Sequence, residues 1–121
     1  MKQPVRVMIV DDQSSARLGL RALLAFFPEV AIVGEASNGQ QAVDVVADLQ
    51  PDVILMDVQM PLMDGLEATR QIKRSQPHIK VIILTIYRTS QVAATAAGVD
   101  GFLLKGGGVE ELQSAILRVV A

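Results

Sequence analysis

Residues 53–57 read VILMD, four apolar residues in unbroken succession followed at once by an aspartate. The same arrangement, an apolar run with a polar residue directly behind it, recurs along the chain. Val7–Val10 precedes Asp11, and Val81–Leu84 precedes Thr85. Short runs that are continuously apolar rather than alternating are typical of strands that are covered on both faces. The stretch therefore predicts a buried parallel strand with an acidic side chain at its carboxyl end.

Extended and helical patterns alternate on both sides of this strand. Apolar residues recur at helical spacing from Ala16 to Phe27 and again from Val109 to Val119. Strands that are separated by helices imply parallel pairing through right-handed crossovers. The sequence thus predicts an α/β fold of five β-α units, a doubly wound sheet in a three-layer α/β/α sandwich. The expected strands are Val5–Val10, Val30–Ala36, Val53–Met56, Val81–Leu84 and Phe102–Leu104.

Turn and capping residues agree with this division. The pair Asn38-Gly39 opens the second helical segment, and Asp64 is the expected N-cap of the third, Leu66–Arg74. The fourth helical segment, Thr89–Ala97, is rich in alanine and threonine, and we expect it to pack weakly. Gly98 stands where a left-handed C-cap would end that segment.

Length and composition narrow the possible functions. The 121 residues fit one domain, and half of them are apolar, which excludes a disordered chain. Without cysteine there is no disulfide framework, zinc thiolate site or catalytic thiol. A net charge of −2 argues against nucleic-acid binding by this chain alone. No apolar run has the length of a secretory signal or a membrane span, so we expect a cytoplasmic protein that does not bind membranes.

Polar side chains follow four of the five predicted strands. They are Asp11 with Asp12, Asp57, Thr85 and Lys105. Each of them alone is more often a turn former or a helix cap than a functional residue. In a parallel sheet, however, the carboxyl ends of the strands are where ligands bind. The joint pattern therefore predicts one site made of three carboxylates, a hydroxyl and an ammonium group.

The charges suggest the chemistry of this site. Clustered carboxylates raise one another's pKa unless a cation neutralises them, and Mg²⁺ is a natural partner for oxygen ligands. With Mg²⁺ and Lys105 the charge of the pocket sums to about zero. Asp57 would then be an ionised nucleophile for an incoming phosphoryl group, and Thr85 would donate a hydrogen bond to that group once it is attached.

Competing chemistries have weak support in the sequence. The run Gly106-Gly107-Gly108 lacks the Lys-Ser/Thr pair of a nucleotide-binding P-loop, and no G-x-G-x-x-G motif follows the first strand. His78 is the only histidine and lies in a polar loop after Pro77, where we expect it to be a solvated surface residue. Histidine-based catalysis and a zinc site are therefore not expected.

Four stretches together strongly resemble the receiver domains of bacterial response regulators. They are Asp11-Asp12, PDVILMDVQMPLMDG at 51–65, Leu84-Thr85 and AGVDGFLLK at 97–105. The resemblance covers essentially the whole chain, so residues 1–121 are expected to be one receiver domain. It implies a flavodoxin-like sheet with strand order 2-1-3-4-5. Residues 33–39 and 60–68 look most like the NarL/FixJ, or LuxR-type, transcription regulators.

The resemblance also implies roles for the acidic residues. Asp57 would accept the phosphoryl group from a sensor histidine kinase. Asp12, Asp57 and the main-chain carbonyl of Gln59 would hold Mg²⁺, and Asp11 would assist through water. The chain would then catalyse only its own phosphorylation and autodephosphorylation and would not be an enzyme in the usual sense.

Three further residues would contact or respond to the phosphoryl group. The resemblance implies that Thr85 and Lys105 contact it, and that Phe102 occupies an aromatic switch position that turns inward when Thr85 moves. An equally good interpretation of Phe102 is an aromatic side chain of the core.

The sequence departs from the family pattern at the edge of the site. Gly106 stands where the family lysine is usually followed by a proline in a cis peptide. Ile86 follows the switch threonine, where the family usually has a small residue, and would narrow access to Asp57. Tyr87 and Gln59 would flank the entrance at positions that influence the lifetime of the phosphoryl group. Tyr87 fits an exposed loop tyrosine equally well.

The expected output is a conformational change that promotes a homodimer and controls transcription. DNA would be bound only through a C-terminal helix-turn-helix domain that is not in this chain, although a stand-alone receiver fits as well. On the first predicted helix, Leu18, Ala22 and Phe26 lie off the core stripe and are candidates for a dimer surface. The alternative is a dimerisation or interaction module that works without phosphorylation. A small-molecule hydrolase is disfavoured because Gln59 stands where such enzymes carry a second acid.

Overall fold

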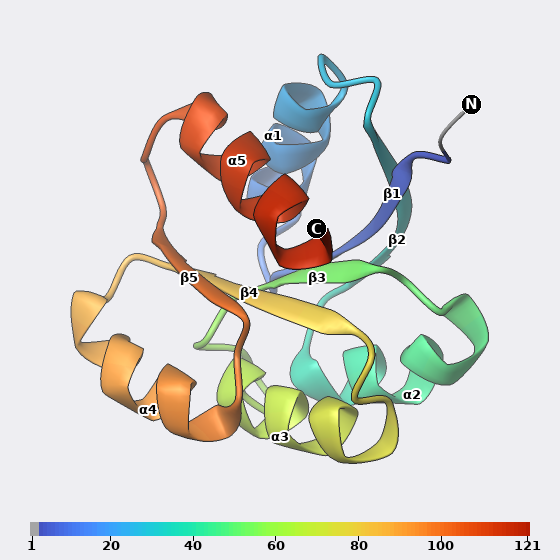
Figure 1. Ribbon diagram of the computed structural model, residues 1–121. Helices are drawn as coiled ribbons and strands as arrows, with labels where there is room; N and C mark the ends of the chain where they lie inside the picture. The colour runs from blue at the N-terminus through green and yellow to red at the C-terminus, as the bar shows by residue number, and fades with distance from the viewer. Residues whose placement is uncertain (1–2) are drawn as a thin grey trace.

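Five parallel strands form one sheet in the order β2-β1-β3-β4-β5 (Figure 1). The computed structural model describes residues 3–121. The strands are β1 (Val5–Val10), β2 (Val30–Ala36), β3 (Val53–Met56), β4 (Lys80–Thr85) and β5 (Gly101–Leu104). The chain reverses its direction of winding between β1 and β3, which confirms the predicted topology and places a crevice at the carboxyl ends of these two strands.

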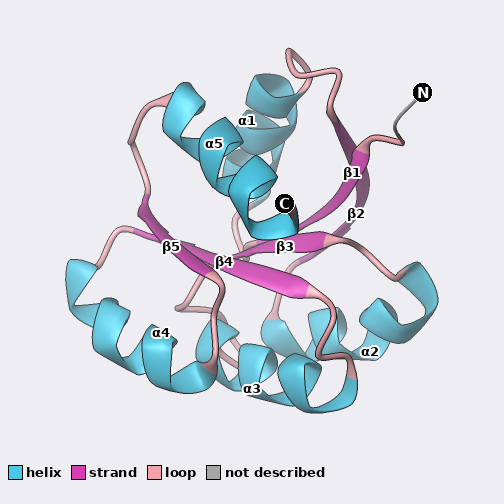
Figure 2. Ribbon diagram, in the orientation of Figure 1, coloured by secondary structure: helices cyan, strands magenta, loops and turns pink. Residues whose placement is uncertain are grey.

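Helices cover both faces of the sheet, as Figure 2 shows. On one face lie α1 and α5, and on the other lie α2, α3 and α4. Their bounds are α1 Ser14–Leu24, α2 Gly39–Leu49, α3 Gly65–Ser75, α4 Gln91–Ala97 and α5 Val109–Val120. A 3₁₀ turn, Arg88–Ser90, precedes α4. The predicted three-layer sandwich is confirmed.

Alternate residues of the central strands enter the two cores. Val7 and Leu55 belong to the cluster under α1 and α5, whereas Met8 and Ile54 belong to the cluster under α2, α3 and α4. All four are essentially inaccessible to solvent. Fully burying an aliphatic side chain contributes roughly 1.5–3 kcal/mol. Burial on both faces explains why these strands are continuously apolar in the sequence.

The predicted helix caps form as expected. Asn38 accepts a hydrogen bond from the Gln41 amide at the start of α2, at 2.8 Å, and Asp64 accepts one from the Glu67 amide at the start of α3, at 2.8 Å. Gly98 ends α4 in the left-handed conformation, with a φ of +90°.

Two helices differ from the expected bounds by more than one residue. The regular part of α1 ends at Leu24 rather than at Phe27, because Pro28 disfavours a helical conformation at the residue before it. The amides of Phe26 and Phe27 instead donate to carbonyls three residues earlier. The predicted segment Thr89–Ala97 begins within the 3₁₀ turn and is regular only over the seven residues of α4.

Within residues 3–121, no helix has both the length and the apolar character that crossing a membrane would require.

Candidate functional site

Three carboxylates meet at the carboxyl edge of the sheet. Asp11 and Asp12 follow β1, and Asp57 follows β3. One oxygen from each of the three side chains lies within 4.8 Å of the others. Asp11 is buried, Asp57 is partly buried and Asp12 is exposed. The structure therefore brings together the acidic residues that the sequence singled out, in a crevice that is open on the Asp12 side.

Lys105, which follows β5, reaches into this cluster. Its Nζ lies 2.7 Å from Asp11 Oδ2 and 3.1 Å from Asp57 Oδ2. One ammonium group against three carboxylates leaves a formal charge of −2. A hard divalent cation suits that charge and the all-oxygen donor set. Oxygens within 4.8 Å of one another suit a single ion that some of the carboxylates bind directly and others through water, because Mg²⁺ usually keeps several waters.

The cluster changes the acidity of its members. Burial raises the pKa of Asp57 and the charge of Asp11 raises it further, while Lys105 and the Val58 amide oppose the shift without cancelling it. Burial alone would lower the pKa of Lys105, but its hydrogen bonds with Asp11 and Asp57 more than offset this and hold that pKa above its ordinary value. Lys105 therefore stays charged, and a second cation would neutralise the negative charge that remains on the three carboxylates.

The main chain around Asp57 is held by tight packing. The Asp57 amide donates to the Val10 carbonyl at 2.9 Å, and the Gly65 amide donates to the Val58 carbonyl at 2.8 Å. A Cβ atom on Gly65 would overlap the main-chain oxygen of Asp57. In the sequence, Gly65 ends the stretch 51–65 that resembles receiver domains and precedes the predicted helix Leu66–Arg74. Its role in letting α3 approach Asp57 depends on a tertiary contact that no local pattern reveals.

The side chains at the end of β4 and directly after it differ in their exposure. Thr85 is buried, and its Oγ1 accepts a hydrogen bond from the Tyr87 amide at 3.3 Å. Ile86 and Tyr87 are 64% and 42% exposed. Both therefore lie at the surface next to Thr85 in the sequence, and their role at the entrance of the site stays a prediction.

The remaining predicted positions lie at the edge of the site. Phe102 is partly buried and packs against the core cluster under α2, α3 and α4, so the core interpretation holds in this structure and the switch role stays a prediction. Gln59 is exposed, two residues beyond Asp57. Gly106 has a φ of +85°, a conformation that glycine adopts without strain.

Sequence reasoning missed Arg17. Its Nη1 donates to the main-chain oxygen of Asp11 at 2.6 Å, and its Nε donates to Glu35 at 3.0 Å. Glu35 also pairs with Arg21, and the two arginines lower the Glu35 pKa, Arg21 most strongly. The arrangement clamps the main chain just before Asp12. Arg17 lies on the polar side of α1, where a solvated cation is the default expectation, so the sequence carried no signal for it.

Comparison with known proteins finds a protein family whose model covers most of the chain. The family model of the response regulator receiver domain matches residues 7–117. Over 119 residues the chain is 40% identical to the response regulator GacA of Pseudomonas aeruginosa. That alignment covers 97% of this chain and 56% of GacA, so the chain spans about half the length of this relative.

Solved structures resemble the whole chain. A LuxR-family two-component response regulator from Aurantimonas sp. SI85-9A1 has a TM-score of 0.92 and 31% identity, covering 98% of this chain and 86% of that one. The signal receiver domain of the response regulator NarL from Mycobacterium tuberculosis has a TM-score of 0.90 and 31% identity, covering 98% of each chain.

Proposed function

Because the chain belongs to the response regulator receiver domain family, we propose that Asp57 accepts a phosphoryl group from a sensor histidine kinase. Receiver domains of two-component systems partner with such kinases, and the relatives of this chain include response regulators of the LuxR family, one of them described as DNA-binding, and NarL. The observation that carries the proposal is the pairing of Asp57 with Lys105 beside two further carboxylates. Asp57 is the one whose main chain is braced by Gly65.

The transfer would be a direct displacement at phosphorus. A carboxylate oxygen of Asp57 attacks the phosphorus of phosphohistidine and forms an O–P bond, while the N–P bond breaks and its electron pair stays on the imidazole nitrogen. Lys105 offsets charge on the phosphoryl oxygens. The Thr85 hydroxyl accepts from the Tyr87 amide, so its own proton is available for a phosphoryl oxygen. Water later cleaves the acyl phosphate, so the chain acts only on its own phosphoryl group.

Receiver domains bind Mg²⁺ at an acidic pocket, and the donor set here fits that ion. We assign Asp12, Asp57 and the main-chain carbonyl of Gln59 as its ligands, with Asp11 acting through water. The bound ion would neutralise charge that Lys105 alone leaves uncompensated.

The response would run through Thr85, Phe102 and α4. Only Ala94 and Ala97 of α4 are buried, and Val92 is 83% exposed. Such weak packing suits an element that shifts between two states. We expect this conformational shift to promote a homodimer. We also expect the protein to be located in the cytoplasm. Transcriptional control would be exerted by a helix-turn-helix domain of a longer protein, since the matched region covers only 56% of GacA.

Phosphorylation by a small donor tests the assignment. With Mg²⁺ and acetyl phosphate, the protein should gain the mass of one phosphoryl group, and Asp57→Ala should abolish the gain. Asp48→Ala, which changes an exposed acid on α2, is the matched control and should behave like the wild type. A gain that survives Asp57→Ala would refute the assignment. No gain at all, together with dimerisation that beryllofluoride leaves unchanged, would favour a module that works without phosphorylation.

A further inference from the structure

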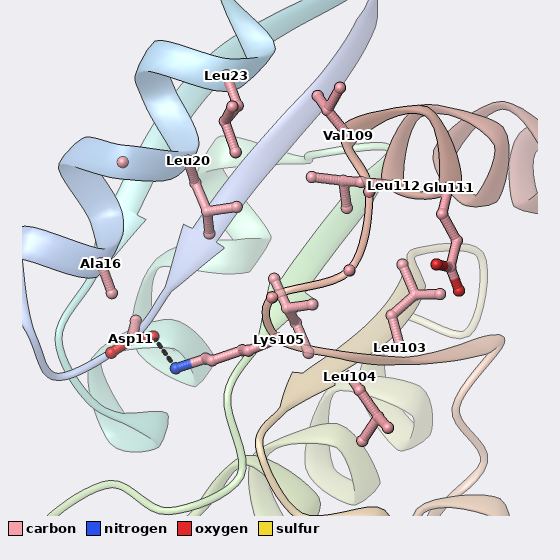
Figure 3. Close-up of a pocket in the computed structure, with 15 residues that line it drawn as sticks. Asp11, Ala16, Leu20, Leu23, Leu103, Leu104, Lys105, Val109, Glu111 and Leu112 are labelled. Carbon is pink, nitrogen blue, oxygen red and sulfur yellow. Dashed lines mark hydrogen bonds and ion pairs between the residues drawn. The ribbon is translucent and has the colours of Figure 1, made fainter.

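A second cavity lies between α1, α5 and the loop that joins β5 to α5 (Figure 3). Its volume is about 230 Å³. Its walls are mainly aliphatic and include Leu20 and Leu23 of α1, Leu103 of β5, and Val109 and Leu112 of α5. Asp11 and Lys105 close one end, where their ion pair joins the cavity to the acidic crevice. Most of the cavity lining is therefore apolar, in contrast to the acidic crevice described above.

Four glycines also line this cavity: Gly19, Gly106, Gly107 and Gly108. A Cβ atom added to Gly19, Gly106 or Gly108 would meet no atom within 4 Å. No close contact therefore demands glycine at Gly19, which lies inside α1, where glycine is less favourable than alanine. Part of the cavity is the space that side chains at these positions would fill.

We propose that this cavity binds a small uncharged aromatic molecule. An apolar cavity of about 150 Å³ already suffices to bind benzene, so a two-ring molecule matches the volume here. The charges at the cavity disfavour an anion. The Lys105 ammonium group is already paired with Asp11 and Asp57, and within residues 3–121 no lysine or arginine pairs with Glu111 at the rim.

The position of the cavity links it to the acidic crevice. Lys105 is followed directly by the three cavity-lining glycines, all of which are exposed. Its side chain runs from the cavity wall to Asp11 (Figure 3). A molecule in the cavity would therefore contact the loop that positions the Lys105 ammonium group, and occupancy would restrain that loop.

Titration with indole tests the proposal. We expect saturable one-to-one binding in ¹⁵N–¹H NMR spectra of the unphosphorylated protein, with the largest shifts at the amides of Gly19 and residues 106–109. Gly19→Leu places a side chain into the cavity and should weaken binding at least about tenfold, because the bulk of indole no longer fits. Ala47→Leu, at an exposed position of α2 on the other face of the sheet (Figure 1), is the matched control and should bind as the wild type does.

Three results would overturn the proposal. The first is no saturable binding up to the solubility of indole. The second is equal binding by the wild type and Gly19→Leu. The third is a dimer in sedimentation that Gly19→Leu dissociates, which would mean that a second copy of the chain fills the cavity. If Gly19→Leu fails to fold, Gly19→Ala replaces it, with a weakening of about twofold expected and unchanged affinity as the contrary result.

Discussion

The two halves of the carboxyl edge of the sheet are built in different ways. In the half formed by β1 and β3, the Asp57 amide is bonded to Val10 and the main chain of Asp57 is pressed against Gly65. In the half formed by β4 and β5, Ile86 is 64% exposed and a Cβ atom on Gly106 would meet only open space. The first half is closely packed, and the second has room to move.

This difference in packing separates Asp57, which would react with the phosphoryl group, from the segments that would change conformation after the reaction. A nucleophile is effective when its main chain is held in one position, because orientation is then obtained before the reaction begins. Segments that change conformation come from the less stable parts of a fold, where few buried contacts must be broken. The short helix α4, with two buried alanines, and the glycine loop after Lys105 have that character.

A glycine-to-alanine substitution in each half should give the largest difference in the free energy of unfolding. Gly65→Ala forces a methyl group into the main-chain oxygen of Asp57, so we expect it to lower the free energy of unfolding by about 3 kcal/mol or more. Gly106→Ala has free space but a φ of +85°, and its cost should be about 1 kcal/mol. Urea unfolding of both variants measures the two values.

The comparison between the halves fails if the order is reversed. A loss in Gly106→Ala that equals or exceeds the loss in Gly65→Ala would show that the β5–α5 loop is the more tightly constrained of the two. Gly108→Ala serves as the control, since its φ is −67° and its added Cβ atom also meets open space. Its loss should be smaller than that of Gly106→Ala.

Much of the fold could be predicted because its signals are local. The β-branched and apolar runs predicted the observed bounds of β1, β2 and β3, and Asp64 and Gly98 marked a helix start and a helix end. Strand ends also fix which side chains meet, since parallel strands bring their carboxyl ends to one edge. The meeting of Asp57 with Lys105 could therefore be expected without coordinates.

Other features depend on contacts between residues that are distant in the sequence. The clamp from Arg17 onto the Asp11 carbonyl depends on Glu35, 18 residues away. The cavity beside Gly19 exists because two helices and a loop leave a space between them. Periodicity identifies the apolar face of a helix, but it does not show whether side chains fill the volume next to that face.

A smaller effect is expected from removing the charge of Asp57. Burial and Asp11 raise the pKa of Asp57, so in the metal-free protein its ionised form is less favourable in the folded state than in the unfolded state. Asp57→Asn should therefore be more stable than the wild type at neutral pH. The amide can still accept the hydrogen bond from the Val58 amide. Thermal unfolding in a chelator measures the difference.

The pH dependence of this difference follows from the sign of the shift. The cost of ionised Asp57 is fully present above its raised folded-state pKa and disappears below its ordinary value of 3.8. The advantage of Asp57→Asn should therefore vanish in acid. Added Mg²⁺ should stabilise the wild type more than the variant. A variant that is less stable than the wild type at neutral pH without metal would mean that the Lys105 contact outweighs burial.

The smallest effect concerns the clamp behind the acidic turn. Arg21 and Arg17 lower the pKa of Glu35, so its ion pairs stabilise the fold above its ordinary value of 4.5, and this stabilisation is lost as the pH falls through the lowered folded-state value. Pairs at the surface contribute about 0–1 kcal/mol. Glu35→Gln should therefore be slightly less stable than the wild type at neutral pH, and equally stable in strong acid.

Glu67→Gln is the control that tests whether the effect of Glu35→Gln is specific to the closely packed half. Glu67 also has a lowered pKa, through Gln71 and Arg70 on α3, but it has no link to Asp11. In NMR spectra only Glu35→Gln should move the Asp12 and Gln13 amides, because only Glu35 orients the arginine that holds the Asp11 carbonyl. Equal shifts in both variants would show that the acidic turn is held by the sheet alone, and the clamp would then contribute nothing to the rigidity of this half.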